Sequence, residues 1–144
     1  DSSAPCYWRQ HARSQQTMHG EWVVTGDLFR VDEGGFYWYE GRADDMIKVG
    51  GEWVSPIEME NALIGHPAVR EAAVVGISVE GTTRIQAVIV LAPERTGSDE
   101  LTRELQGWCK DWLQRYKYPH RVLYAAELSK TTSGKVQRFQ LRRP

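Results

Sequence analysis

β-favouring residues cluster between polar turns in the stretch from residue 21 to residue 54. In residues 21–42 these clusters surround the turn sequences TGD and DEGG, which predicts short strands joined by tight turns. The segment MIKVGGEWV predicts a β-hairpin closed by Gly50 and Gly51, because glycine readily adopts the positive φ angles of such turns. The aromatic residues that alternate with polar neighbours here are expected to belong to the core: Trp22, Phe36, Trp38 and Trp53.

The sequence SPIE, which follows directly, is typical of a helix start. Ser55 can accept a hydrogen bond from the backbone N–H of Glu58, and Pro56 suits the first helical position. The Glu58 side chain can in turn reach back to Ser55, which completes a capping box. The helix is expected to run to about Leu63, where Gly65 stops it.

Two apolar segments, residues 72–79 and 85–91, are rich in β-branched residues and bounded by Gly, Thr and Pro. They predict buried strands that pair in one sheet. A further short strand is expected at residues 121–125. These strands and the helices together predict an α+β protein: a small mixed β-sheet with flanking helices, preceded by an N-terminal β-hairpin.

Between Ser98 and Arg115 the apolar residues recur at helical spacing, which predicts a second, amphipathic helix. Asp99 complements the positive end of the helix dipole. Trp108 and Trp112 lie on one face of this helix and are expected to pack against the sheet.

Composition limits the functions open to the chain. A length of 144 residues suits one domain, or one domain with part of a neighbour. The net charge of −1 provides no field that would attract nucleic acid, and the longest apolar stretch is too short to span a membrane. Cys6 and Cys109 have neither disulfide-framework nor zinc-site spacing, so no metal site is predicted and a cytoplasmic location is expected.

The sequence KTTSGK near the end of the chain raises the question of a phosphate-binding lysine. It does not match the nucleotide-binding loop GxxxxGK followed by Ser or Thr, because Ser129 and Val136 occupy two of the required positions. Basic residues nonetheless accumulate at residues 129–144 without any acidic residue: Lys130, Lys135, Arg138, Arg142 and Arg143. Two interpretations stay open, a solvated basic tail and a site for an anion.

Three motifs in order resemble the C-terminal end of the adenylate-forming enzymes, a family that includes acyl- and aryl-CoA ligases, peptide-synthetase adenylation domains and firefly luciferase. They are TGD at residues 25–27, GRADDMIKVGGEWVSPIEME at residues 41–60 and KTTSGKVQRFQLR at residues 130–142. Within the family the chain is most similar to the aryl-CoA ligases, benzoate-CoA ligases among them. Where the family usually has Pro, this chain has Ser129, which puts the rigidity of the lysine loop in question.

The resemblance implies a two-step reaction. A small aromatic carboxylic acid attacks ATP to give an acyl adenylate and pyrophosphate, and the thiol of CoA then displaces AMP to give a thioester. It also implies that residues 1–43 are the tail of a large N-terminal domain and that residues 44–144 form a mobile lid, with Asp44 as the hinge. Mg²⁺ would accompany ATP, held by ligands outside this chain.

The resemblance further assigns roles to single residues. Lys135 is the expected catalytic lysine of adenylation, because its charge can stabilise the charge that develops at the α-phosphate. Asp27 would accept hydrogen bonds from the ribose hydroxyls of ATP or AMP, and Arg42 would support the same ribose.

Four further residues are expected to contact CoA. Gly50 and Gly51 would lie beside the pantetheine channel, where the absence of a side chain lets the backbone approach closely. Tyr116 would stack on the CoA adenine or belong to the core, and Lys117 would meet a CoA phosphate.

Two other functions remain open at this point. One is an adenylation domain that loads a carrier protein in place of CoA. The other is a small α/β binding module without catalytic chemistry, in which Lys135 and Asp27 would be replaceable.

Overall fold

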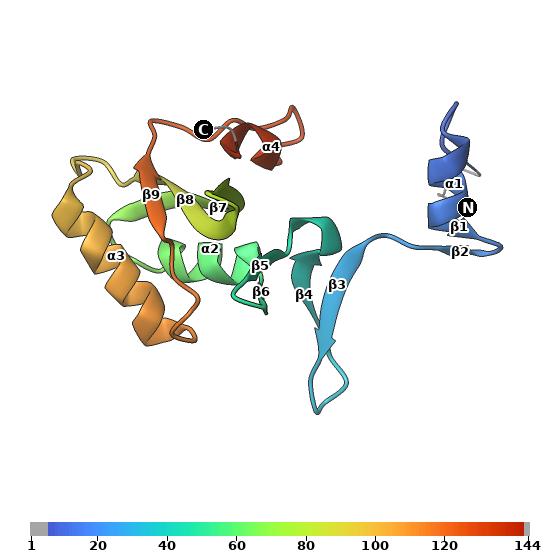
Figure 1. Cartoon of the computed structure of the whole chain (residues 1–144), viewed down its shortest axis with the longest axis horizontal. Helices are drawn as coiled ribbons and strands as arrows, with labels where there is room; N and C mark the ends of the chain where they lie inside the picture. Colours follow the sequence, from blue (N-terminus) through green and yellow to red (C-terminus); the bar gives the residue numbers. More distant parts are fainter. Residues whose placement is uncertain (1–5, 143–144) are drawn as a thin grey trace.

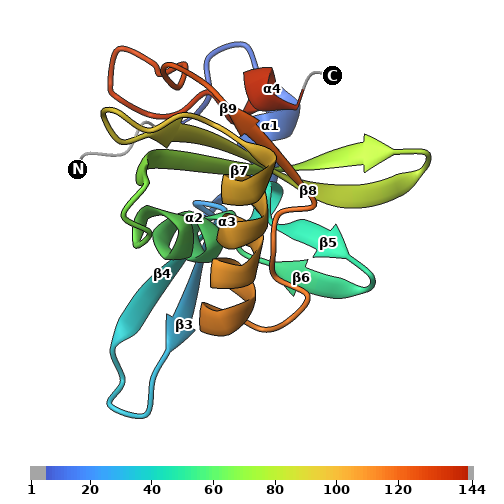
Figure 2. The ribbon, with the colours of Figure 1, turned by 90° about the vertical axis from the view of Figure 1, so that its left-hand side faces the viewer.

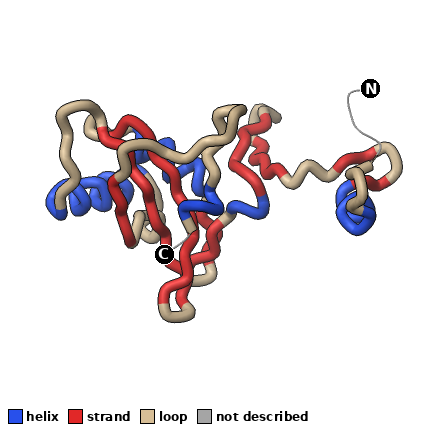
Figure 3. Tube along the Cα trace, turned by 90° about the horizontal axis from the view of Figure 1, so that it is seen from above, coloured by secondary structure: helices blue, strands red, loops and turns tan. Residues whose placement is uncertain are grey.

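The computed structural model describes residues 6–142. Its N-terminal part consists of α1 (His11–Thr17), β1 (Met18–His19) and β2 (Trp22–Val23), where the two short strands pair antiparallel. Figures 1 and 3 show this part at one end of the molecule, joined to the remainder by an extended segment. Residues 1–5 of the expected large-domain tail and Arg143 of the basic tail lie outside the described residues.

β3 (Asp27–Val31) and β4 (Tyr37–Arg42) form an antiparallel hairpin that projects from the body of the protein (Figure 2). Asp32 organises its turn. One carboxylate oxygen accepts hydrogen bonds from the backbone N–H groups of Gly34 and Phe36, and the other accepts from the Trp38 indole at 2.7 Å. The bond from Trp38 is the main reason why the pKa of Asp32 is lowered.

The expectation that the aromatic residues of this region are core residues is wrong. More than half of the surface of each is exposed: Trp22, Phe36, Trp38 and Trp53. All four belong to two-stranded hairpins or their loops. On the β5–β6 hairpin the buried positions are Ile47 and Val54, so Trp53, next to Val54, points to the opposite, exposed face. Alternation predicted the strands correctly, but it does not show which layer covers their apolar face.

A single helical turn, η1 (Ala43–Asp45), leads from β4 to a second hairpin of β5 (Ile47–Val49) and β6 (Glu52–Val54). The turn between these strands consists of Gly50 and Gly51, with φ angles of 59° and 94°. Positive φ values at both central residues are what a two-residue hairpin turn requires, and the predicted hairpin is confirmed.

Helix α2 (Pro56–Ile64) begins as predicted, with the Ser55 hydroxyl accepting a hydrogen bond from the Glu58 N–H at 3.3 Å. The second half of the predicted capping box is wrong. The Glu58 carboxylate binds the Nζ of Lys117 at 2.7 Å instead of reaching back to Ser55. An ammonium group is a stronger partner for a carboxylate than a neutral backbone N–H, and Lys117 is within reach.

The core is built around a three-stranded sheet in the order β7-β8-β9. β7 (Val69–Val79) and β8 (Thr82–Leu91) are antiparallel, whereas β9 (Arg121–Tyr124) runs parallel to β8. The predicted mixed sheet is confirmed. Its helices are α2, α3 (Asp99–Trp112) and the short α4 (Arg138–Leu141); α3 ends three residues before Arg115.

Both faces of this sheet are covered. On one face Val74, Ile85 and Ile89 pack with Leu63 of α2 and Leu105 of α3. On the other face the C-terminal segment lies across the sheet, and its covering residues pack on intervening strand positions: Ala73, Val88 and Val90 from the strands, with Leu128, Val136 and Leu141 from the segment. Burial on two faces explains why these strands are continuous apolar runs.

The two tryptophans of α3 do not pack against the sheet, and that expectation is wrong. Leu105 and Cys109 occupy the buried stripe of the helix, so Trp108 and Trp112 lie at its margin. The Trp108 indole donates a hydrogen bond to the carbonyl of Ala62 in α2 at 2.7 Å, and its ring lies 5.4 Å from that of Trp112. No helix in the described part of the chain is long and apolar enough to cross a membrane.

Replacing Gly97 with Ala is expected to destabilise the fold. A Cβ at this position would lie 2.2 Å from the Tyr124 ring, whose hydroxyl is hydrogen-bonded to Thr102 in α3. Forcing these groups apart should lower the free energy of unfolding by about 1–3 kcal/mol in urea denaturation. The matched control is Gly107→Ala inside α3, where an added Cβ would have no neighbour within 4 Å. Because alanine has a higher helix propensity than glycine, this variant should be more stable than wild type. Equal stability of the two variants would contradict the packing described.

The two cysteines are expected to react differently with iodoacetamide. Burial raises the pKa of the Cys109 thiol to about 11, which keeps it protonated at pH 8, and the side chain is inaccessible. Cys6 is exposed. Mass spectrometry should find Cys6 alkylated in the native protein and Cys109 alkylated only in denaturant. Similar native rates for both thiols would argue against the core as described.

Candidate functional site

The lysine loop, residues 130–136, is a small hairpin closed by a β-bridge between Lys130 and Val136. Within it the Thr131 N–H donates to the Lys135 carbonyl at 2.8 Å, and the Lys135 N–H donates to the Thr131 hydroxyl at 3.1 Å. Gly134 takes a φ of 80°, which glycine adopts without steric cost. This positive φ at Gly134 lies in the turn that leads the chain back to Lys135.

The base of the loop is tied as well. The Gln137 N–H donates to the Ser129 carbonyl at 2.9 Å, so the residue that replaces the family's usual proline takes part in the closure. Ser129 contributes only its backbone carbonyl, an acceptor that a proline would also provide.

Lys135 faces a cleft of about 560 Å³ that it shares with the two expected nucleotide-binding residues. Residues from β3, β4, η1, α2 and the C-terminal segment line this cleft: Asp27, Tyr39, Gly41, Arg42, Asp45, Pro56, Ile57, Lys135, Val136 and Arg138. The structure therefore brings together Asp27, Arg42 and Lys135, which are separated by up to 108 positions in the sequence (135 − 27).

Arg42 and Asp27 form an ion pair at the wall of the cleft. Nη1 of Arg42 lies 3.5 Å from Oδ1 of Asp27, and Nη2 lies 3.8 Å from Oδ2 of Asp44. Gly26, with a φ of 76°, allows the guanidinium to come close, since a Cβ there would lie 3.1 Å from Nη2. The guanidinium lies beside the Asp27 carboxylate and leaves oxygen lone pairs free to accept further hydrogen bonds.

Lys135 itself forms no ion pair with any described residue, and its side chain is exposed. The cleft thus combines a carboxylate with an ammonium group that has no ion-pair partner among the described residues. A carboxylate suits vicinal hydroxyls and an ammonium suits a phosphate, so the donor set fits a nucleotide with its ribose toward Asp27 and its phosphates toward Lys135.

Arg138 is a cleft residue whose role the sequence did not indicate. Its Nη2 contacts both carboxylate oxygens of Glu60 at 2.7 Å, and Glu60 also accepts the Val74 N–H at 2.8 Å. Burial raises the pKa of Glu60, and the bonds from Val74 and Arg138 oppose that shift. The signal available in the sequence was a second cation three positions after Lys135, in a tail without acids.

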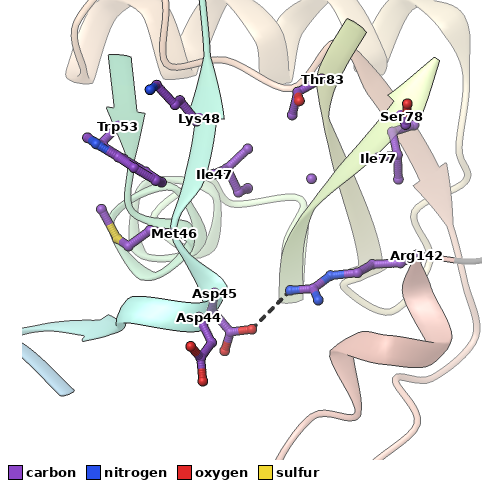
Figure 4. A pocket seen from close by; sticks show the side chains of 11 residues that line it. Asp44, Asp45, Met46, Ile47, Lys48, Trp53, Ile77, Ser78, Thr83 and Arg142 are labelled. Carbon is purple, nitrogen blue, oxygen red and sulfur yellow. Dashed lines mark hydrogen bonds and ion pairs between the residues drawn. The ribbon is translucent and has the colours of Figure 1, made fainter. Parts of the chain in front are cut away.

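The expected hinge residue, Asp44, lies in η1 between β4 and β5. A hydrogen bond spans this point: the Ser55 hydroxyl donates to the Glu40 carbonyl at 2.6 Å. Figure 4 shows Arg142 reaching from the end of α4 to Asp45, a contact of 3.0 Å beside a pocket of about 410 Å³. Asp44 lines that pocket and not the cleft of Lys135.

The four expected CoA residues do not line the cleft of Lys135. Gly50 and Gly51 are exposed at the tip of the β5–β6 hairpin, and nothing lies within 4 Å of a Cβ at either position. Tyr116 is partly buried against the main core cluster. Lys117 is largely buried, with 13% of its side chain exposed, and its Nζ is bound to Glu58.

Tyr118 lines a separate pocket of about 680 Å³. The charged residues of its lining are all basic, namely Arg84, Lys110 and Arg121, and His120 lines it as well. Burial and the charges of Arg84 and Lys110 lower the pKa of His120. Among the described residues no group of three or more His, Cys, Asp and Glu side chains could hold a metal ion.

The fold and these motifs define the class of protein. The chain belongs to the family of AMP-binding enzyme C-terminal domains, whose profile matches residues 58–135. This confirms the resemblance to adenylate-forming enzymes on which the expected site residues were based.

Several relatives of the chain are named as CoA ligases of aromatic acids. The benzoate–CoA ligase of Thauera aromatica is 46% identical over 142 residues, which are 98% of this chain and 27% of that protein. The solved structure of a benzoate CoA ligase from Burkholderia xenovorans matches with a TM-score of 0.92 and 42% identity. The solved structure of an anthranilate CoA ligase in complex with anthranoyl-AMP matches with a TM-score of 0.90 and 45% identity. Each comparison covers 99% of this chain and 28% of the other. The chain therefore spans about a quarter of the length of these relatives.

Replacing Ser55 with Ala should lower the free energy of unfolding. The hydroxyl caps α2 and donates to the Glu40 carbonyl, so both bonds are lost. A loss of about 1–2 kcal/mol is expected in urea denaturation. The exposed Ser78 provides the control, since Ser78→Ala should change stability by no more than about 0.5 kcal/mol. If Ser55→Ala were no less stable than this control, the contact across Asp44 would not exist in solution.

Proposed function

We propose that this chain is the C-terminal part of an ATP-dependent aryl-CoA ligase that adenylates a small aromatic carboxylic acid and then forms its CoA thioester. The observation that carries the proposal is the cleft in which Asp27, Arg42 and Lys135 meet. The relatives support it, since three aromatic-acid CoA ligases match nearly the whole chain.

In the adenylation step Lys135 is the proposed catalytic residue. Its ammonium group neutralises charge that develops between the attacking carboxylate and the α-phosphate of ATP. Asp27 accepts hydrogen bonds from the ribose hydroxyls, and Arg42, which lies beside Asp27, supports the same ribose. The proposed Mg²⁺ accompanies the phosphates on ligands outside the described residues.

The domain boundary is part of the proposal. We place residues 1–43 in the large domain and residues 44–144 in the lid, with rotation at Asp44. Exposed aromatic residues on β3 and β4 support this boundary, because a large apolar surface on a small domain marks a contact with another protein surface. Rotation would break the Ser55–Glu40 hydrogen bond and carry Lys135 away from Asp27.

For the thioester step, the exposed Gly50–Gly51 turn is proposed to approach the pantetheine arm of CoA once the lid has turned. The basic pocket at Arg84, Lys110 and Arg121 supports a substrate rich in phosphate groups, since its lining contains no acidic side chain. Tyr116 and Lys117 border this region in sequence. Lys117 would have to leave Glu58 to meet a CoA phosphate.

A second candidate is an enzyme that forms the same adenylate but passes the acyl group to a different acceptor, such as a carrier protein or an amine. An amide bond synthetase from Marinactinospora thermotolerans shares the fold, with a TM-score of 0.83 at 30% identity. The higher identity to CoA ligases, 42–46%, favours CoA as the acceptor. A purely structural binding module would not account for an uncompensated lysine facing the Asp27–Arg42 pair.

Lys135→Ala in the full-length enzyme should separate the two half-reactions. Without the ammonium group, benzoate-dependent exchange of pyrophosphate into ATP is expected to fall about 10²–10³-fold, the usual cost of losing one stabilising charge or donor. Thioester formation from preformed benzoyl adenylate and CoA should be retained, because Lys135 acts only in the first step.

Lys130→Ala is the matched control, since Lys130 belongs to the same loop but is paired with Glu71. It should keep most of the exchange activity. Unchanged exchange in Lys135→Ala would overturn the role proposed for this lysine. Wild-type exchange with another aromatic acid but none with benzoate would discard benzoate and leave the ligase proposal intact.

A further inference from the structure

The lysine loop is joined to the rest of the protein by an ion pair at each end. Before the loop tip, Nζ of Lys130 lies 2.5 Å from the Glu71 carboxylate, on β7. After it, Arg138 binds Glu60 on α2. Both carboxylates belong to the body of the proposed lid, so each pair connects one end of the loop to that body.

The two pairs differ in burial, and this difference decides which of them anchors the loop. Glu60 and Arg138 have 13% and 22% of their side chains exposed, compared with 31% and 40% for Glu71 and Lys130. Exposed ion pairs contribute little because water and salt screen them. A buried pair is different, since removing one partner leaves the other without compensation.

Glu60 is itself held rigidly. Its helix, α2, packs on β7, which is an edge strand of the sheet. The Glu60 carboxylate accepts a hydrogen bond from the N–H of Val74, in the middle of β7. The same carboxylate binds Nη2 of Arg138 through both oxygens. The Nε of Arg138 is buried and has no hydrogen-bond partner among the described residues. Among those residues, Glu60 is the only ion-pair partner of Arg138.

The distance from this anchor to the lysine is short along the chain. Arg138 follows Lys135 by three residues, and Val136 between them is paired with Lys130 and packed on the second face of the sheet. A displacement of Arg138 would therefore loosen the arm that carries Lys135. The hydrogen bond from Gln137 N–H to Ser129 closes the same arm.

We infer that Glu60 is a positioning residue for Lys135: by binding Arg138 it fixes the lysine loop on the lid, so that the lysine moves with the lid as one rigid unit. The inference rests on the proposed function in so far as Lys135 is the catalytic group. Glu60 contacts no substrate in this account and acts only through Arg138 and the loop.

The decisive experiment is hydrogen exchange by mass spectrometry on the full-length protein, with Glu60→Gln compared with wild type. Glutamine keeps an oxygen that can accept the Val74 N–H but lacks the charge that holds Arg138. Peptides that cover residues 129–138 are expected to exchange at least tenfold faster. Peptides from β8 should be unchanged, because the sheet core does not depend on the pair.

Glu71→Gln is the matched control and should leave exchange of the loop within about twofold of wild type, as expected for a screened pair. Should Glu60→Gln fail to fold, Arg138→Gln tests the same pair from the C-terminal side, where α4 contains no buried residue. Wild-type exchange of the loop in the folded variant, or an equal effect of Glu71→Gln, would overturn the inference.

Kinetics on the same variants separate this inference from the proposed function. With Glu60→Gln, kcat for pyrophosphate exchange should fall at least tenfold while KM for ATP changes less than twofold, and thioester formation from preformed adenylate should persist. A loosened loop with unchanged kcat would refute the positioning role. If Lys135→Ala did not change the rate of pyrophosphate exchange, the proposed function would be refuted. The hydrogen-exchange result on Glu60 would still stand.

Discussion

The need to cover both faces of the three-stranded sheet governs the arrangement of the whole site. Helices α2 and α3 bury one face, and the chain that follows β9 covers the other. Residues 125–141 therefore return across the sheet, and Val136 and Leu141 fill that second layer. The lysine loop is part of this return path, so burial of the sheet brings Lys135 to the edge of α2, where β3 and β4 contribute Asp27 and Arg42.

Local patterns in the sequence were sufficient for most of the elements. Ser55 and Pro56 marked the start of α2, the two glycines marked the turn of the β5–β6 hairpin, and the β-branched runs marked β7 and β8. These features depend on backbone geometry and on residues close in sequence. The mixed character of the sheet followed from the order of strands and helices, which leaves a long crossover before β9.

Contacts between distant residues could not be predicted in the same way. Alternation placed Trp38 and Trp53 in strands but could not show which face of each strand is covered, so both were wrongly assigned to the core. The expected bond from Glu58 to Ser55 was replaced by one to Lys117, which lies 59 positions away. The Glu60–Arg138 pair spans 78 positions, and no local pattern indicates it. For the site itself, the resemblance to a family supplied the candidates, and the cleft brought three of them together.

The most direct test of this account is a crystal structure of the full-length protein with a non-hydrolysable ATP analogue and benzoate. The account predicts that one nucleotide contacts both ends of the cleft, with its ribose hydroxyls hydrogen-bonded to Asp27 and its α-phosphate within ion-pair distance of Nζ of Lys135. A nucleotide bound with its ribose away from Asp27 would contradict the central claim, because the cleft would then have no role in adenylation.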